Sequence, residues 1–352
     1  MRSPRADKRS PRDLILIALV GVLLGGAILA INLYTAWRLE NHILPSTPYA
    51  DVFSKLDDPV DILFALGDGQ AFLALARDPT LSHLDAFRNV RSEASLRASR
   101  PLQGYLGWVF SAGRPKWAEE GVVIATVLGC GIGVFGCALL LHRRRVNPWL
   151  ALLVLELPGA LAGIRQLGPE VLGLGLVAIA LVTRDDDRPW VSVFLFALAG
   201  LARETYLLIP LLLAWRERKY LIAPATWLAW VLIVWARFGE FAPFVKQDQA
   251  GLLGAPFVGL ARALPHLRFP VFTALVLTAI PLVAIVTWKK RRGDPLTPIV
   301  VAYALFAAFF SRRILLWWAS FSRPLLPMTA FALIALLTSS DQALDGERSV
   351  SG

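Results

Sequence analysis

The sequence predicts an all-α integral membrane protein with about ten transmembrane helices and a long first extracytoplasmic loop. Of its 352 residues, 56% are hydrophobic and 18% are charged, and the mean hydropathy is +0.57. A soluble domain is about a quarter charged. The apolar residues form long runs, and basic residues cluster in short connectors between them. Orientation in a membrane therefore explains the net charge of +10, and we predict no nucleic-acid partner.

The first apolar run follows a basic segment. Residues 1–13, MRSPRADKRSPRD, are predicted to be a cytoplasmic tail, and residues 14–34 carry no charge. A run of more than about 20 apolar residues is long enough to cross a hydrocarbon core of about 30 Å. A signal peptide has a shorter apolar core and a small-residue cleavage site. We therefore predict that residues 14–34 are an uncleaved anchor.

Nine further apolar runs are predicted spans. With the anchor they make up a polytopic membrane domain over residues 14–338, which a polar cytoplasmic tail follows at 339–352. The nine runs are 119–141, 148–165, 168–183, 189–202, 204–215, 221–237, 270–288, 297–311 and 324–338.

Four short basic connectors determine the predicted orientation. They are HRRRVN (142–147), RDDDR (184–188), RERK (216–219) and KKRR (289–292). All four fall on the side of the amino terminus if the ten spans are right. Basic residues concentrate in cytoplasmic loops, so both termini are predicted to be cytoplasmic, in a multi-pass plasma- or inner-membrane protein.

Two segments are too short for simple spans. The runs 189–202 and 204–215 either form two short spans or a hairpin that enters the membrane part of the way. PLQGYLGWVFSAG (101–113) is also too short to cross, which indicates an interfacial or re-entrant helix.

The predicted orientation places loop 35–100 outside the cytoplasm. Its segments 60–78 and 81–100 have the pattern of amphipathic helices around turns. Asp68 lies in the Gly-Asp-Gly-Gln turn of the first segment. A carboxylate beside the membrane can be desolvated on one side and reached by substrate on the other, which suits a general base. The alternative is that Asp68 only caps the helix that begins near Gln70.

Three further features concern the predicted spans. Cys130 and Cys137 share a helix face and are too far apart in one helix to form a disulfide, so we predict no metal or redox role for them. Gly129 and Gly133 have the small-xxx-small spacing of closely packed helices. Glu156 lies deep in span 148–165, where it has either a function or a hydrogen bond to a neighbouring helix, and we assign it no role.

Five segments, in order along most of the chain, resemble motifs of GT-C-type polytopic glycosyltransferases. The resemblance is to bacterial multi-span members with an Asp-Gly-Gln motif in the first external loop. The segments are GDGQAFLALARDP (67–79), RASRPLQGYLGW (97–108), LPGALAGIRQLGPEVLGLGL (157–176), LARETYLLIPLLLAW (201–215) and WWASFSRPLLP (317–327). Gly67 and Ala71 stand where the family has aromatic residues, which reduces the surface for stacking on a sugar.

The resemblance implies an enzyme that transfers a sugar from a polyprenyl-phosphate donor to an acceptor hydroxyl outside the cytoplasm. The acceptor would be a glycan or lipid of the cell surface, and the reaction would invert the anomeric carbon. Asp68 is the predicted catalytic base. Gln70 and Arg100 fall in the matching motifs and are predicted to bind substrate. Glu170 and Glu204 are predicted to bind sugar hydroxyls or to orient arginines.

Arginines at the predicted external span ends run against the bias of basic residues toward the cytoplasm. A lipid phosphate is a natural bidentate partner for them, and interfacial snorkelling is the alternative for each one. These predicted donor-binding residues are Arg165, Arg203, Arg312, Arg313 and Arg323.

The sequence predicts no metal or other cofactor. Some GT-C enzymes use a divalent metal, but Asp57, Asp58 and Asp61 do not have a metal-binding spacing. Trp317 and Trp318 are predicted to anchor the chain at the membrane interface, with stacking on sugar or lipid as the alternative. Two alternatives to an enzyme remain, a transporter or flippase of lipid-linked sugars and a non-catalytic GT-C-like assembly partner.

Overall fold

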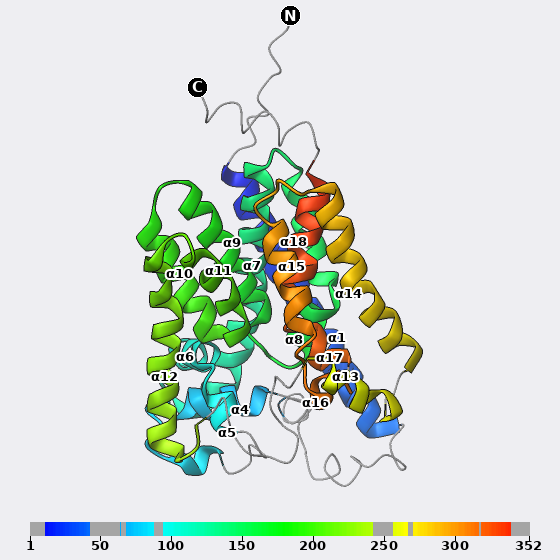
Figure 1. The fold of residues 1–352 in the computed structure, drawn as a ribbon. Coiled ribbons are helices and arrows are strands. Elements are labelled where there is room, and N and C mark those ends of the chain that lie inside the picture. Colours follow the sequence, from blue (N-terminus) through cyan, green and yellow to red (C-terminus); the bar gives the residue numbers. More distant parts are fainter. Residues whose placement is uncertain are drawn as a thin grey trace, which may run out of the picture.

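The structure is a computed structural model that describes residues 11–42, 64, 68–87, 94–241, 256–266, 270–316 and 318–338. Within these ranges the chain forms α-helices and short 3-10 helices without a strand, which confirms the predicted all-helical class. Figure 1 shows long helices lying side by side, with short helices gathered at one end of the bundle. Apart from residues 11–13, the two predicted polar tails lie outside the described residues.

A helix or a pair of helices coincides with each of the ten predicted spans. Proline stands in the first turn of several of them, where its missing N–H costs nothing. In chain order the helices are α1 (Pro11–His42), α7 (Ala118–Arg143), η3 (Pro148–Glu156) with α8 (Pro158–Arg165), α9 (Glu170–Asp185), α10 (Pro189–Ala202), η4 (Glu204–Leu207) with α11 (Leu208–Ala214), α12 (Ile222–Phe238), α14 (Pro270–Lys290), α15 (Thr297–Ala307) and α18 (Leu326–Leu337).

Three helical segments of the described chain are long and apolar enough to cross a membrane. They are Pro11–Thr35, Pro115–Arg143 and Arg218–Phe238. The pair η3 and α8, which is bent by 63° where Leu157 takes an extended conformation, makes a fourth if it counts as one span. The helices α10, η4–α11, α15 and α18 are apolar but shorter. The structure thus has the apolar helices of a membrane protein, and ten full crossings remain a prediction.

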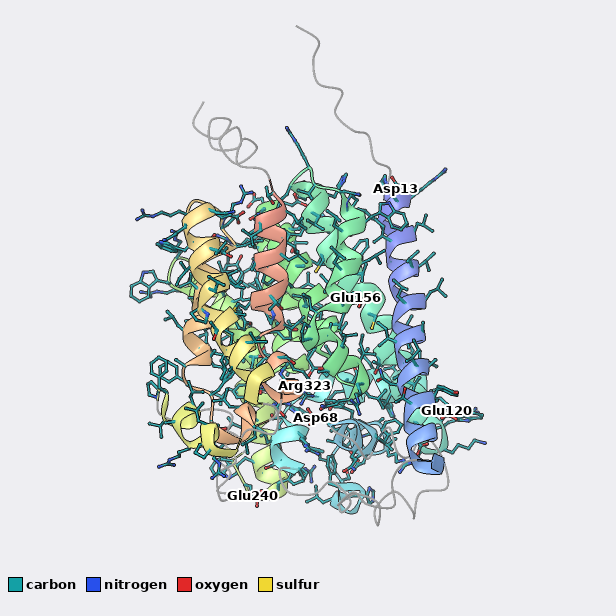
Figure 2. The ribbon with its side chains drawn as sticks, turned by 90° about the vertical axis from the view of Figure 1, so that its right-hand side faces the viewer. Asp13, Asp68, Glu120, Glu156, Glu240 and Arg323 are labelled. Atoms are coloured by element: carbon teal, nitrogen blue, oxygen red, sulfur yellow. The ribbon has the colours of Figure 1, made fainter. Side chains whose placement is uncertain are left out.

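Ion pairs bring the four basic connectors together at one end of the bundle. Arg143 pairs with Asp186 at 2.5 Å and Arg184 with Glu217 at 3.3 Å. Arg144 pairs with Asp294 at 2.5 Å. We call this the Asp13 end, after the residue near the start of α1, and the opposite end the Asp68 end (Figure 2). The clustering agrees with the predicted topology, in which these connectors share one side.

Exposed tryptophans lie near both ends of the bundle. Trp149, Trp190, Trp215 and Trp288 stand next to the four basic connectors. Trp117, at the start of α7, is exposed at the opposite end. Tryptophans at two levels are typical of the two interfaces of a bilayer.

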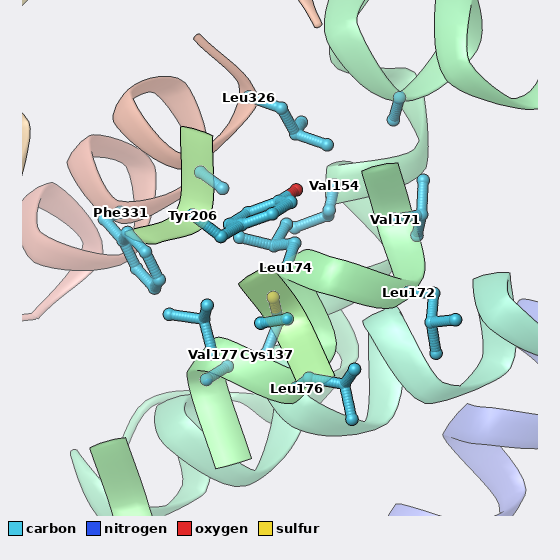
Figure 3. Close-up of a cluster of buried hydrophobic side chains, with 14 of the residues drawn as sticks. Cys137, Val154, Val171, Leu172, Leu174, Leu176, Val177, Tyr206, Leu326 and Phe331 are labelled. Carbon is cyan, nitrogen blue, oxygen red and sulfur yellow. The ribbon is translucent and has the colours of Figure 1, made fainter. Parts of the chain in front are cut away.

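The core lies where α7 packs between α1 and α9. A Cβ added at Gly133 would lie 2.5 Å from the carbonyl oxygen of Val171, and one at Gly136 would lie 2.4 Å from that of Gly175. The backbones of α7 and α9 therefore touch, as the predicted small-residue spacing requires. Cys130 and Cys137 are free thiols buried in this core, and Figure 3 shows Cys137 among apolar side chains.

The segment 189–215 folds as a hairpin of two short helices. The break falls at Arg203, whose φ of −158° and ψ of 130° are extended. The other ends of the hairpin return to one level, because Arg184 before α10 pairs with Glu217 after α11. Helix α10 has 14 residues, or about 21 Å at 1.5 Å per residue, against a core of about 30 Å. This geometry favours the part-way hairpin.

The described part of loop 35–100 is helical, as its amphipathic pattern predicts. It contains α4 (Gly69–Arg77), η1 (Leu84–Phe87) and α5 (Ala94–Ala98), and α6 (Pro101–Phe110) follows directly. Helix α6 is too short to cross, as predicted, and packs against α4 and α7. Four more short helices, α13 (Val258–Ala263), η7 (Leu264–His266), α16 (Arg312–Leu315) and α17 (Trp318–Ser322), lie near the Asp68 end in Figure 1.

Candidate functional site

A group of buried charged side chains lies at the Asp68 end of the bundle. Figure 2 shows Asp68 and Arg323 close together there, although they are 255 residues apart in the chain. Buried charges are stable only when they are paired and hydrogen-bonded. We call this group the arginine cluster; its members are Asp68, Arg97, Arg100, Glu170, Arg203, Glu204 and Arg323.

Asp68 is the carboxylate that joins the two sides of the cluster. It precedes α4, but its side chain makes no capping hydrogen bond to that helix. Its Oδ2 instead accepts hydrogen bonds from Arg323 at 2.9 Å and Arg100 at 3.3 Å. Its Oδ1 lies 3.4 Å from Nε of Arg97. The capping alternative for Asp68 is therefore wrong, and the carboxylate faces three guanidinium groups.

Arg100 is held in place by Glu204. Its Nε and Nη2 both donate to the Glu204 carboxylate at 2.7 Å, which is the fork geometry of a bidentate pair. Its Nη1 remains for Asp68. Arg100 precedes Pro101 at the start of α6, and Glu204 follows the break of the α10–α11 hairpin. The hairpin thus places its turn against the external-loop helices.

Glu170 forms the other side of the cluster, at the first turn of α9. It is fully buried and accepts hydrogen bonds from Arg203 and, at 3.2 Å, from Arg323. A Cβ added at Gly168 would lie 2.1 Å from Oε2 of Glu170, so only glycine leaves room for this carboxylate. Tyr206 donates its hydroxyl hydrogen to the backbone carbonyl of Glu170 and fixes the start of α9 against η4.

Among the described residues, the cluster has four arginines and three carboxylates, so these side chains together carry one positive charge in excess. Its buried atoms without a hydrogen-bond partner within the described chain include Nε of Arg203 and Oε2 of Glu170. Unsatisfied buried polar atoms are rare in native proteins and call for an explanation. An anion that binds the arginines would neutralise the excess charge.

The electrostatic state of Asp68 follows from its neighbours. Burial alone would raise the pKa of Asp68, but the guanidinium groups of Arg323, Arg97 and Arg100 outweigh burial and hold this pKa well below its usual value. Asp68 is therefore ionised at neutral pH. It is also a weak base in this arrangement, since a base works best with a pKa near the working pH.

Other predicted site residues lie outside the cluster. The partly buried Arg165, at the end of α8, and Arg312, at the start of α16, form no ion pair within the described ranges, and Nε of Arg312 is buried without a hydrogen-bond partner there. Gln70 lies in the first turn of α4 and is not one of the cluster's ion-pairing residues. The side chains of Arg313 and Trp318, and all of Trp317, lie outside the described residues.

The sequence analysis missed Arg97 and Tyr206. Arg97 stands three residues before Arg100 in the same RASR segment, so on a helical turn the two would share a face. That spacing was the available signal. Tyr206 lies two residues after Glu204 in an apolar run, and nothing in the sequence marks it.

Glu156 is separate from the cluster. It ends η3, directly before the bend of the η3–α8 pair, and its side chain is exposed. Figure 2 places it about midway between Asp13 and Asp68. Within the described chain it forms no hydrogen bond, so the alternative of a bond to a neighbouring helix gains no support.

No group of three or more His, Cys, Asp or Glu side chains is arranged to hold a metal ion in the described part of the chain. Asp57, Asp58 and Asp61 lie outside that part. Scans against protein-family models, curated proteins and solved structures gave no match to this chain. The resemblance to GT-C glycosyltransferases therefore rests on the five motifs.

Proposed function

We propose that the protein is a membrane glycosyltransferase that moves a sugar from a polyprenyl-phosphate donor to an acceptor hydroxyl on the extracytoplasmic side. The observation that carries the proposal is the arginine cluster, which joins a buried carboxylate to an excess of guanidinium groups. Its residues come from all five segments that resemble GT-C motifs and lie together at the Asp68 end of the bundle. Glycan or glycolipid assembly at the cell surface is the process that such a reaction would serve.

In the proposed reaction the acceptor oxygen attacks the anomeric carbon of the donor sugar. A new carbon–oxygen bond forms as the bond from that carbon to the phosphate oxygen breaks. The bonding pair leaves with the lipid phosphate, which Arg203 and Arg323 stabilise. The hydroxyl proton passes to Asp68. One displacement without a protein nucleophile inverts the anomeric carbon, and Glu170 and Glu204 orient the arginines through the contacts described above.

The predicted membrane topology supports the proposal. The predicted spans, with 189–215 either as two spans or as a part-way hairpin that returns to its own side, and with the four basic connectors in the cytoplasm, would place the Asp68 end outside. A lipid-linked donor and a surface acceptor can meet there. The helices α4, α5 and α6 would then lie at the outer interface. Lipid bilayer, lipid-linked donor and glycan or lipid acceptor are the partners that this arrangement implies.

A transporter or flippase of lipid-linked sugars is the second candidate, and Glu156 at the bend of η3 and α8 favours it. Transporters place binding groups near the midplane at broken helices. The arginine cluster instead lies toward one end of the bundle (Figure 2). A non-catalytic assembly partner is the third candidate, and the loss of aromatics at Gly67 and Ala71 is compatible with it.

The deciding experiment is Asp68→Asn in proteoliposomes that contain a polyprenyl-phosphate sugar, with envelope glycans from a strain lacking the protein as acceptors. The turnover number kcat should fall by roughly 10²–10⁴, which is the usual contribution of a general base. The donor KM should stay equal or decrease, because one carboxylate that competes for the arginines is gone. Asp186→Asn, which removes an exposed ion pair at the Asp13 end, is the matched control and should transfer normally.

Three other results would contradict the proposal. Near-normal transfer by Asp68→Asn would remove Asp68 from catalysis. A higher donor KM with unchanged kcat would give Asp68 a structural role only. Movement of lipid-linked sugar between leaflets by a wild-type protein that transfers no sugar would identify a flippase.

A further inference from the structure

Arg97 differs from the other three arginines of the cluster. It is the described arginine that faces Oδ1 of Asp68, at 3.4 Å, whereas Arg100 and Arg323 face Oδ2. Its side chain is 18% exposed, against 7% for Arg100, 8% for Arg323 and 3% for Arg203. A ligand that approaches from solvent or lipid therefore reaches Arg97 before it reaches the others.

The backbone that carries Arg97 is fixed. The carbonyl oxygen of Ala98, the next residue, accepts a hydrogen bond from the indole of Trp230 on α12 at 2.8 Å. Ser95 donates to Glu240 after the same helix at 3.3 Å. Helix α5 is thus attached to the end of α12. A change of partner at Arg97 is therefore a movement of its side chain and not of the backbone.

The two oxygens of Asp68 have different surroundings. Oδ2 accepts from Arg100 and Arg323, which are each held by a second carboxylate, Glu204 and Glu170. Oδ1 faces Arg97. Two donors, each anchored by a second carboxylate, therefore hold Oδ2, and the contact on Oδ1 can break while both of them stay in place.

We propose that Arg97 is a donor-binding residue that exchanges Asp68 for the donor phosphate, and that this exchange frees Oδ1 of Asp68 to accept the acceptor's proton. The inference rests on the proposed glycosyl transfer and adds to it an order of events. A phosphate competes well for a guanidinium group because it offers bidentate, charge-assisted hydrogen bonds. Oδ1 of Asp68 then becomes available as a base only when the donor is in place.

The test compares Arg97→Gln with Arg77→Gln. Arg77, in the last turn of α4, forms an exposed pair with Glu119 at 2.6 Å and lies outside the cluster, so its variant is the matched control. The first measurement is binding of a polyprenyl phosphate to detergent-purified protein. Arg97→Gln should weaken binding by about 10- to 100-fold, the contribution of one charge-assisted hydrogen bond, and Arg77→Gln should not change it. Binding by Arg97→Gln equal to that of wild type would overturn the inference.

The second measurement is transfer at saturating donor. Because Oδ1 is already free in Arg97→Gln, its kcat should stay within about threefold of wild type while its donor KM rises by the same factor as the binding constant. A kcat that falls 100-fold at unchanged KM would overturn the exchange. Arg97→Lys should restore part of the affinity, since lysine keeps the charge without the fork.

The two proposals fail in different ways. If Asp68→Asn abolishes transfer but Arg97→Gln binds and turns over like wild type, the glycosyltransferase stands and the exchange is wrong. If wild type transfers no sugar but Arg97→Gln weakens lipid-phosphate binding, the transferase is wrong and Arg97 remains a ligand of the lipid phosphate.

Discussion

The ion pairs at the two ends of the bundle differ in how their charges are balanced. At the Asp13 end, Arg144 and Asp294 form one forked pair with contacts of 2.5 and 3.0 Å. Asp294 also accepts from the backbone N–H of Leu296 at 2.8 Å, at the start of α15. One cation meets one anion, and both carboxylate oxygens have donors.

The arginine cluster at the Asp68 end is not closed in this way. Its described side chains include one arginine more than the carboxylates, and Nε of Arg203 and Oε2 of Glu170 are buried without a partner in the described chain. The Arg144–Asp294 pair connects helices, and its charges are balanced without a ligand. An unbalanced cluster, whose Arg203 and Glu170 are more deeply buried than Arg144, indicates a place that is completed by a ligand. This difference distinguishes a structural ion pair from a candidate ligand site, and it does not depend on a comparison with related proteins.

The largest expected effect comes from breaking the closed pair. Asp294→Ala leaves the partly buried Arg144 without its counterion, and we expect the free energy of unfolding to fall by about 3 kcal/mol. Reversible unfolding in mixed micelles would measure it. Asp186→Ala, which breaks the exposed pair with Arg143 at the same end, is the control and should cost about 1 kcal/mol or less. Equal losses in the two variants would show that burial does not distinguish these pairs.

The next effect concerns completion of the cluster by a ligand. A polyprenyl phosphate at 100 times its dissociation constant should raise the free energy of unfolding by about 2.7 kcal/mol. Arg203→Gln should lose much of this gain at the same ligand concentration, because it removes one arginine of the cluster. Asp186→Ala should keep all of it. A gain that survives in Arg203→Gln would place the lipid phosphate elsewhere.

The smallest expected effect concerns pH, because the contribution of Asp68 to stability should not change with pH near neutrality. The pKa of Asp68 is lowered in the folded protein, so its contribution to stability is complete above its unfolded pKa of about 4 and is lost only as the pH falls through the folded value. The difference in unfolding free energy between wild type and Asp68→Asn should therefore stay constant from pH 8 to pH 5. A difference that declines over this range would mean that the arginines do not control Asp68.

Much of the fold could be predicted from the sequence, because apolar runs of the right length become helices wherever a membrane or a core surrounds them. The site was predicted less completely. Asp68, Arg100, Glu170 and Arg323 were found through motif order, yet their pairing could not be, since Arg100 and Glu204 are 104 residues apart. Arg312 looked equivalent to Arg323 by its position at a span end. The packing of α16 and α17 distinguishes the two, because it places Arg323 in the arginine cluster and Arg312 outside it.

The capping alternative for Asp68 failed for a related reason. An Asp before a helix has two ways to use its carboxylate, and local sequence favours the nearer one. Three arginines from other segments compete with the backbone N–H groups of α4, and their combined charge prevails. Such competition depends on the tertiary fold and leaves no local signal.

The backbone contact between α7 and α9 divides the proposed catalytic site into a stationary half and an adjustable half. Glycines at 133, 136 and 175 leave no space in which α9 could slide or turn against α7. Glu170, at the start of α9, is consequently a fixed reference point, and so are the arginines bound to it. In the proposed enzyme, any rearrangement during turnover must then come from side chains on α4 and α5, since α5 itself is attached to α12. Variants with altered donor preference should accordingly arise by side-chain changes on these two short helices, because changes along α9 would cost the packing of the whole bundle.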